Sequence, residues 1–406
     1  MRIGPTIAAV ASTLTACHHT PAQVNFGGPW SGLDRVLEAG VANKQVAGVV
    51  VLVARDGKVV YRRAAGVADR EEGRPVTENS LFRMGSMTKA VVSVAALSLV
   101  DQGVLGLEDP VARWLPQFRP RLPDGTAPAI TVRDLLTHTA GLDYLFLEPP
   151  DGPYHRAQVS TGFDQPGLSL EENLGRLGSV PLLFPPGTRW QYSMATDVLG
   201  AVIESAAGAP LPEVVQERVT SRLLMEATFS PSPAQLERLA TPYAAADPSG
   251  VVRMGEPHQA AMGPLTLTFS PLRASVKASY PSGGAGMIGT AGSYLTFLEA
   301  LRTGRPKLLE TETLAALTSN QIGALAVPKE GGDWGWSLAF PILKQPEPKT
   351  PWASGTWSWG GVWGTHFIVD PAAGLSVVVM TNTAIIGLAG PFPDAVRDAV
   401  YAAITP

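Results

Sequence analysis

A serine and a lysine stand three positions apart at the mouth of an almost wholly apolar segment. Ser86 and Lys89 belong to the run FRMGSMTKAVVSVAALSLV, residues 82–100. On a helix this spacing places the hydroxyl and the amine on one face, and the helix N-terminus adds backbone N–H groups and a positive dipole end. These are the components of an activated nucleophile. A serine N-cap followed by a lysine that reaches solvent would produce the same pattern.

The apolar residues after Ser86 predict a buried helix that ends near Gly103. Residues 90–100 are too few to cross a bilayer, which needs roughly 20 residues. Burial disfavours the charged form of an amine, so the same surroundings would help to make Lys89 a proton acceptor.

Several other catalytic motifs are missing from the chain. No serine lies in a G-x-S-x-G elbow, there is no H-E-x-x-H, and the six histidines lack metal-ligand spacing. We therefore expect no metal ion and no cofactor. Gly284, Gly286 and Gly289 match a dinucleotide fingerprint, but no buried strand precedes them, so we interpret them as a tight turn into a helix at 293–301.

Composition indicates an ordered, loop-rich globular domain of enzyme size. The chain has 406 residues, of which 45% are apolar, and a net charge of -4. These values allow a sizeable core, and the absence of a basic run argues against nucleic-acid binding.

Strand signals gather at the two ends of the chain. A helix at 30–43 precedes a hairpin around Asp56-Gly57, and a second hairpin around the turn at 370–374 precedes a helix at 393–404. Helical patterns and proline-rich loops occupy the middle. The expected division is a possible N-terminal signal or extension at 1–24, an α/β lobe at 25–82 and 283–406, and an inserted helical lobe at 83–282.

The N-terminus leaves localisation open. Leu14-Thr15-Ala16-Cys17 resembles a bacterial lipobox, and Cys17 is the only cysteine, so no intrachain disulfide can form. Processing at this box would make the protein periplasmic and lipid-anchored, which is the one membrane association that the sequence suggests. Without processing, the segment is an extension of a cytoplasmic protein.

Five ordered segments carry a resemblance that spans residues 30–400. FRMGSMTKA, ITVRDLLTHTAGL, FPPGTRWQYS, GGAGMIGTAGSY and WSWGGVWGTHFIVDP occur in the order found in the serine β-lactamase and penicillin-binding protein superfamily. The chain resembles most closely the family VIII carboxylesterases, relatives of class C β-lactamases. This resemblance implies an α/β fold of the serine β-lactamase type, with an antiparallel sheet flanked by helices and an inserted, mainly helical lobe.

The resemblance also implies a catalytic set. Ser86 would be the nucleophile, Lys89 its partner in the S-x-x-K motif, and Tyr192 the tyrosine of the second motif. The backbone N–H groups of Ser86 and Val362 would form the oxyanion hole. Either Lys89 or Tyr192 could be the general base. His138 and Asp134 are interpreted as structural.

The third motif departs from the penicillin-recognising members. Trp359-Gly360-Gly361 stands where Lys-Thr-Gly or His-Thr-Gly is usual, and Met194 replaces an asparagine that can orient a β-lactam side chain. With Trp363, these third-motif residues are the expected substrate-binding positions. Six of the nine tryptophans fall between 334 and 363, where they would form either a substrate pocket or core packing.

These features predict a serine carboxylesterase that cleaves short-chain acyl esters through an acyl-enzyme on Ser86. The alternative is β-lactamase or D,D-peptidase activity, including as a side reaction on cephalosporins. A third interpretation, an inert penicillin-recognising or sensor protein, is disfavoured because Ser86, Lys89 and Tyr192 are all present. The sequence leaves the oligomeric state undetermined.

Overall fold

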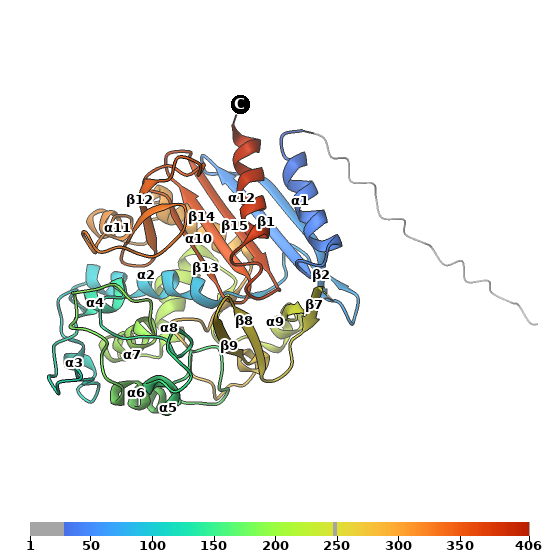
Figure 1. Cartoon of the computed structure of the whole chain (residues 1–406). Helices are drawn as coiled ribbons and strands as arrows, with labels where there is room; N and C mark the ends of the chain where they lie inside the picture. Colours follow the sequence, from blue (N-terminus) through green and yellow to red (C-terminus); the bar gives the residue numbers. More distant parts are fainter. Residues whose placement is uncertain (1–27, 247–249, 406) are drawn as a thin grey trace, which may run out of the picture.

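The computed structural model describes residues 28–246 and 250–405, so the lipobox at 14–17 lies outside the described residues. Its centre is an eight-stranded antiparallel sheet whose strands come from both ends of the chain (Figure 1). This confirms the predicted fold class. In spatial order the strands are β11 (Gly332–Trp336), β12 (Pro341–Pro346), β13 (Trp357–Gly361), β14 (Thr365–Asp370), β15 (Leu375–Thr381), β1 (Gly48–Arg55), β2 (Lys58–Asp69) and β3 (Arg74–Pro75).

Both faces of the sheet are buried under helices. Strand β1 shows this directly, because side chains alternate between the faces of a strand. Val49 and Val51 join the core beneath α1 (Ser31–Ala42) and α12 (Pro391–Ile404), whereas Val50 joins the core that contains α10 (Ala291–Thr303). Helices α1 and α12 pack against each other on their face (Figure 1).

The predicted first hairpin is confirmed at its turn. Asp56 and Gly57 have φ angles of 51° and 79°, the left-handed pair that a two-residue type I′ turn requires. The hairpin then pairs with the C-terminal part of the chain, because β1 lies beside β15 with Val51 opposite Val379. The two ends of the chain therefore build one continuous sheet.

The middle of the chain is mainly helical, as expected. Helix α2 (Thr88–Asp101) is the predicted central helix: every residue from Thr88 to Leu99 is buried, and Gly103 with φ 70° follows its end. The remaining helices are α3 (Val111–Trp114), α4 (Val132–Thr137), α5 (Pro153–Arg156), α6 (Leu170–Ser179), α7 (Ala195–Ala207), α8 (Leu211–Val215), α9 (Pro233–Arg238) and α11 (Thr311–Leu317).

Short strands in this region went beyond the sequence prediction. Hairpins form from β6 (Tyr243–Ala246) with β7 (Gly250–Arg253) and from β8 (His258–Met262) with β9 (Leu265–Phe269). The stretches YAAA of β6 and HQAAM of β8 are alanine-rich and lack the β-branched alternation that signals a strand, whereas LTLTF of β9 has this alternation over only five residues. A further small sheet joins β4 (Phe82–Arg83), β10 (Ile288–Gly289) and β5 (Ala227–Thr228). The lobe boundaries at 82 and 283 stay predictions.

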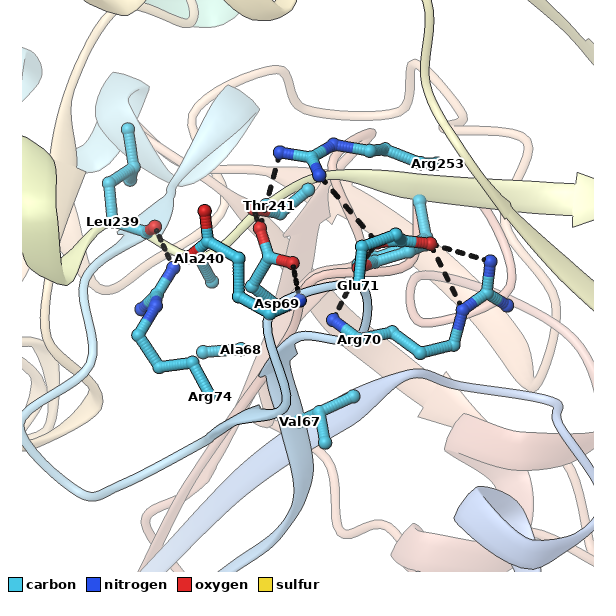
Figure 2. Close-up of polar contacts among 12 residues, drawn as sticks. Val67, Ala68, Asp69, Arg70, Glu71, Arg74, Leu239, Ala240, Thr241 and Arg253 are labelled. Carbon is cyan, nitrogen blue, oxygen red and sulfur yellow. Dashed lines mark hydrogen bonds and ion pairs between the residues drawn. The ribbon is translucent and has the colours of Figure 1, made fainter.

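The buried carboxylate of Asp69, at the end of β2, forms polar contacts that hold the β6–β7 hairpin in place. Asp69 accepts hydrogen bonds from the Thr241 hydroxyl and the Glu72 amide, and its Oδ2 lies 3.2 Å from a guanidinium nitrogen of Arg253 (Figure 2). Burial raises the pKa of Asp69, but the hydrogen bonds and the Arg253 charge outweigh burial, so the net pKa lies below its ordinary value. The ionised carboxylate therefore stabilises the fold.

We predict that Asp69→Asn lowers the free energy of unfolding by about 2 kcal/mol at pH 7, through the lost charge-assisted hydrogen bonds. Because the folded pKa is depressed, this contribution is present above the unfolded value of about 3.9 and is lost as pH falls through the folded pKa. The difference in the free energy of unfolding between parent and variant should shrink below about pH 4. Denaturant unfolding at pH 7 and below pH 4 measures this difference, and Glu72→Gln is the control. A difference that does not change with pH would contradict the prediction.

Candidate active site

Ser86 lies in a short 3-10 turn, Gly85–Met87, that leads directly into α2. Its side chain is 9% exposed and makes no hydrogen bond to another described residue. The N-cap of α2 is Met87, without a side-chain cap, and Lys89 is only 2% exposed. The alternative of a capping serine with a solvent-reaching lysine is therefore wrong.

The turn that carries Ser86 is pressed against the end of β13. Gly85 has φ 53°, and a Cβ on it would lie 3.0 Å from Cα of Gly361 and 3.2 Å from the amide nitrogen of Val362. Only glycine accommodates both the left-handed backbone and this close approach. The predicted oxyanion-hole residues, Ser86 and Val362, thus lie on backbone segments that touch.

Hydrogen bonds on both sides hold the same turn in place. The Thr365 hydroxyl of β14 donates to the carbonyl of Met84 at 3.0 Å, and the Met84 amide donates to the carbonyl of Met287 at 2.9 Å. The Met287 amide in turn donates to the Thr88 hydroxyl at 3.2 Å. Segments from the late part of the chain therefore fix the start of α2.

The structure brings Lys89 and Tyr192 together, as predicted. The Lys89 amine donates to the phenol oxygen of Tyr144 at 2.9 Å and to the carbonyl of Gly284 at 2.8 Å. It also lies 4.8 Å from the centroid of the Tyr192 ring. The Tyr192 phenol oxygen is buried and has no hydrogen-bond partner among the described residues. A buried polar group of this kind, facing an amine, is typical of a catalytic site.

Two adjacent loops bring the tyrosines together. The Met194 amide donates a hydrogen bond to the Asp143 carbonyl at 3.2 Å, and the side-chain amide of Gln191 donates to the Asp143 carboxylate at 2.8 Å. The loop before α7 is thereby joined to the loop after α4. As a result, the rings of Tyr144 and Tyr192 lie 5.2 Å apart.

Tyr144 was missed by sequence reasoning. It lies just beyond the quoted segment ITVRDLLTHTAGL, and nothing in its type or spacing distinguishes it from the other tyrosines. Burial raises the pKa of Tyr144 well above its ordinary value, and the neighbouring Tyr192 and Asp197 raise it further. Tyr144 is therefore a neutral phenol at physiological pH.

Asp197 is a second group that the sequence did not single out. It lies in the first turn of α7 and is fully buried. Burial raises its pKa to about 6, against the opposing influence of Ser282 and of the Lys89 charge. The Asp197 carboxylate interacts electrostatically with the Lys89 amine.

Gly284 is the point that these polar groups surround. A Cβ on it would lie 2.4 Å from Oδ2 of Asp197, 3.2 Å from the Tyr144 phenol oxygen and 3.3 Å from the Lys89 nitrogen. The glycine run does form the predicted turn before a helix, here α10. Its further role, lining the catalytic centre, was not predicted.

We predict that Gly284→Ala lowers kcat for an ester substrate at least about 100-fold, because displacement of a catalytic group by about 1 Å can cost that much. The backbone of Gly284 is not left-handed, so the obstacle is steric. Gly292→Ala in α10 is the matched control, since a Cβ there meets nothing within 4 Å. Steady-state kinetics and circular dichroism test both variants. Unchanged kcat in Gly284→Ala would contradict the assignment of this turn to the site.

The predicted third-motif residues divide into two groups. Trp359 lies beside the site, with its ring 5.1 Å from Tyr192 and 5.1 Å from Trp336. Gly360 and Gly361 end β13 in contacts too close for a side chain. Trp363 points elsewhere: it packs on Phe269 at 4.8 Å, and the Arg83 guanidinium lies over its ring at 5.3 Å.

The tryptophan cluster is also divided. Trp190 and Trp336 join Trp359 around Tyr192. Trp334 and Trp352 instead pack against each other and against Lys329. The site is thus lined by a subset of the cluster, and the rest is packing.

His138 and Asp134 are structural, as interpreted. The Ser193 amide donates to Nδ1 of His138 at 3.3 Å, and Asp134 completes a capping box with Thr131 at the start of α4. Burial lowers the pKa of His138 well below its ordinary value, and the Lys89 charge lowers it further, so the imidazole stays neutral.

Within residues 28–246 and 250–405, no group of three or more potential metal ligands occurs. In the same residues, no single helix is long and apolar enough to span a bilayer, although the bent pair Ala195–Ala207 with Leu211–Leu223 reaches that length and apolarity when its two parts are combined.

Comparison with known proteins places this geometry in a family. A serine at the start of a buried helix, with a lysine one turn on, beside an antiparallel sheet, defines a serine hydrolase of the S-x-x-K type. The Beta-lactamase family model matches residues 33–398, and the chain belongs to the β-lactamase family. Within that family, the resemblance of the sequence to the family VIII carboxylesterases is confirmed.

Individual relatives agree. The chain is 45% identical over 378 residues to Esterase EstB of Burkholderia gladioli, which covers 91% of this chain and 94% of that protein. The solved structure of EstCE1, a hydrolase with promiscuous acyltransferase activity, has a TM-score of 0.86 and 37% identity over 92% of this chain and 98% of its own. A simvastatin synthase LovD mutant from Aspergillus terreus, 22% identical, has a TM-score of 0.74 over 95% and 99% of the two chains and shows the fold alone.

Proposed function

We propose that this chain hydrolyses short-chain acyl esters through an acyl-enzyme on Ser86. The chain is a carboxylic ester hydrolase of the serine type. The observation that carries the finer proposal is the buried Lys89 amine, held between the Tyr144 phenol and the Gly284 carbonyl beneath the ring of Tyr192.

In the acylation step, the Ser86 oxygen attacks the ester carbonyl carbon and its proton passes to the Tyr192–Lys89 pair. The backbone N–H groups of Ser86 and Val362 donate to the oxyanion as charge develops. The carbon–oxygen bond to the alcohol then breaks, and the alcohol leaves with the proton from the pair. An acyl group remains on Ser86.

In the second step, a water molecule replaces the alcohol. The Tyr192–Lys89 pair takes a proton from the water as its oxygen attacks the acyl carbon. Collapse of the second tetrahedral intermediate releases the carboxylic acid and returns the proton to Ser86. The step needs no group beyond the side chains and amides already described.

The hydrogen bonds favour Tyr192 as the group that exchanges the proton with Ser86. The Lys89 nitrogen already donates hydrogen bonds to Tyr144 and Gly284, whereas the phenol oxygen of Tyr192 has no hydrogen-bond partner among the described residues. A cation near the ring stabilises negative charge that develops on the phenol during transfer. Lys89 would act through Tyr192.

The surroundings support a neutral, apolar ester as the substrate class. Met194 is fully buried in the core, so it supplies no amide to the site, and Trp359 occupies the place of the cation in the third motif. The half-buried rings of Trp359 and Trp190 make an aromatic wall beside Tyr192, and the fully buried Trp336 packs against that wall. Such a wall gains more from apolar groups than from a carboxylate.

We predict that Ser86→Ala lowers kcat for p-nitrophenyl butyrate at least about 1000-fold, because the covalent step is lost. Tyr192→Phe should lower kcat by a similar factor, since the phenol oxygen is the proton carrier. Ser93→Ala is the matched control, because Ser93 is a buried serine within α2, the helix that follows Ser86. Pre-steady-state bursts and mass spectrometry of the trapped acyl-enzyme give the measurement. Full turnover by Ser86→Ala would reject the proposal.

A second comparison separates the esterase from the β-lactamase or D,D-peptidase alternative. We predict that kcat/KM for p-nitrophenyl butyrate exceeds that for nitrocefin at least about 100-fold, which corresponds to about 3 kcal/mol of differential transition-state binding. The missing amide at Met194 and the missing cation at Trp359 are the physical reason. Equal or higher kcat/KM on nitrocefin would make β-lactam hydrolysis the main activity.

A further inference from the structure

A second cavity shares a wall with the candidate active site. Its volume is about 460 Å³, and Gly286 and Met287 form part of its lining. The same turn touches the catalytic groups on its other side, through the Lys89 bond to Gly284 and the Met84 bond to Met287. Residues from α9 and from the segment after β9 complete the cavity, and these elements lie near each other below the sheet in Figure 1.

The charge of this cavity is one-sided. Its lining includes Arg83, Arg273 and Lys277 and no aspartate or glutamate. Among the described residues, none of the three cations forms an ion pair with a carboxylate. The charge of Glu256 acts on Arg83, and the buried carboxylates of Asp164 and Asp197 act on Arg273. The positive charge available to attract an anion is therefore that of Arg83 and Lys277.

The two guanidinium groups are held rigidly by backbone carbonyls. Arg83 donates to Ala240 at 3.0 Å and to Pro271 at 2.8 Å. Arg273 donates to Asp164 at 2.9 Å and to Tyr280 at 3.0 Å through their carbonyls. Carbonyls orient a guanidinium without neutralising it. Burial lowers the pKa of Arg83 to about 10, which leaves it charged at neutral pH.

The wall also retains unused hydrogen-bonding capacity. Nε of Arg83 and the hydroxyl of Ser270 are buried without a hydrogen-bond partner among the described residues. Buried polar groups are nearly always paired, so an unpaired donor and an unpaired hydroxyl in one wall require an explanation. A bound anion or its water shell would supply the missing acceptors.

The rest of the lining combines several serines with large apolar side chains. Phe163, Phe229, Leu236, Ile288 and Trp363 contribute to it. A mostly apolar cavity of several hundred cubic ångströms with a few polar groups is the usual form of a small-molecule site. An inorganic anion would leave this surface without contacts, whereas an anion with a hydrocarbon body would cover it.

We propose that this cavity binds an organic carboxylate, with the anion towards Arg83 and Lys277 and the apolar body against Phe163, Phe229 and Trp363. Carboxylic acids are the product class of ester hydrolysis, so the ligand is chemically related to the reaction of the neighbouring site. The binding itself needs no turnover and does not depend on the proposed function.

Isothermal titration of the full chain carrying Ser86→Ala tests the proposal without catalysis. The probes are octanoate, octan-1-ol and octylammonium, which share one hydrocarbon body and differ in charge. We expect octanoate to bind with one-to-one stoichiometry and the neutral and cationic probes to bind at least about tenfold more weakly. No octanoate binding, or octan-1-ol binding as tightly, would overturn the proposal.

Two variants locate the binding. Lys277→Glu, at an exposed position of the lining, should weaken octanoate roughly fivefold or more, whereas Lys349→Glu, an exposed lysine outside the cavity, should not. Ala274→Phe should abolish binding by filling the cavity, with circular dichroism confirming its fold. Octanoate binding that survives Ala274→Phe would place the ligand in the catalytic cleft instead and would overturn the proposal.

Discussion

The constraint on which the rest of the structure depends is the burial of one amine. An isolated ammonium inside a protein costs several kcal/mol, so Lys89 can be buried only where neighbours supply acceptors and compensating charge. The phenol of Tyr144 and the carbonyl of Gly284 supply the acceptors, and Asp197 supplies the opposite charge from behind. Each comes from a different segment, so a satisfied lysine requires the loop after α4, the first turn of α7 and the turn before α10 to be in place together.

The same constraint explains why the sheet is built from both chain ends. The turn that carries Ser86 is held by Thr365 from β14 and by Met287 from the loop before α10. Those segments follow Ser86 by about half the chain or more. The catalytic geometry therefore depends on contacts between segments that are distant in sequence.

Local patterns predicted what local physics decides. The Asp56-Gly57 turn, the apolar density of α2 and the hairpin of β14 with β15 each depend on residues close in the chain, and each is confirmed. The catalytic serine, lysine and tyrosine were expected because ordered motifs carried them. Their chemical roles stay predictions, although the structure places Lys89 against Tyr192.

What could not be predicted is decided through space. Tyr144 and Asp197 become part of the site only because the loops after α4 and before α7 meet, and no spacing along the chain encodes that meeting. The strands β6 to β9 escaped notice for a related reason. The alanine-rich sequences of β6 and β8 are strands because β7 and β9 are available as partners, and not because of their own preference.

The pairing of α1 with α12 has a consequence for how the protein can be attached to something else. Both helices cover one face of the sheet, whereas Met84 and Met87, on either side of Ser86, belong to the core of the opposite face. Figure 1 also shows the end of α12 at the far end of the sheet from α2. A tether, carrier surface or fusion partner joined at residue 28 or residue 405 would therefore stand on the opposite side of the sheet from Ser86.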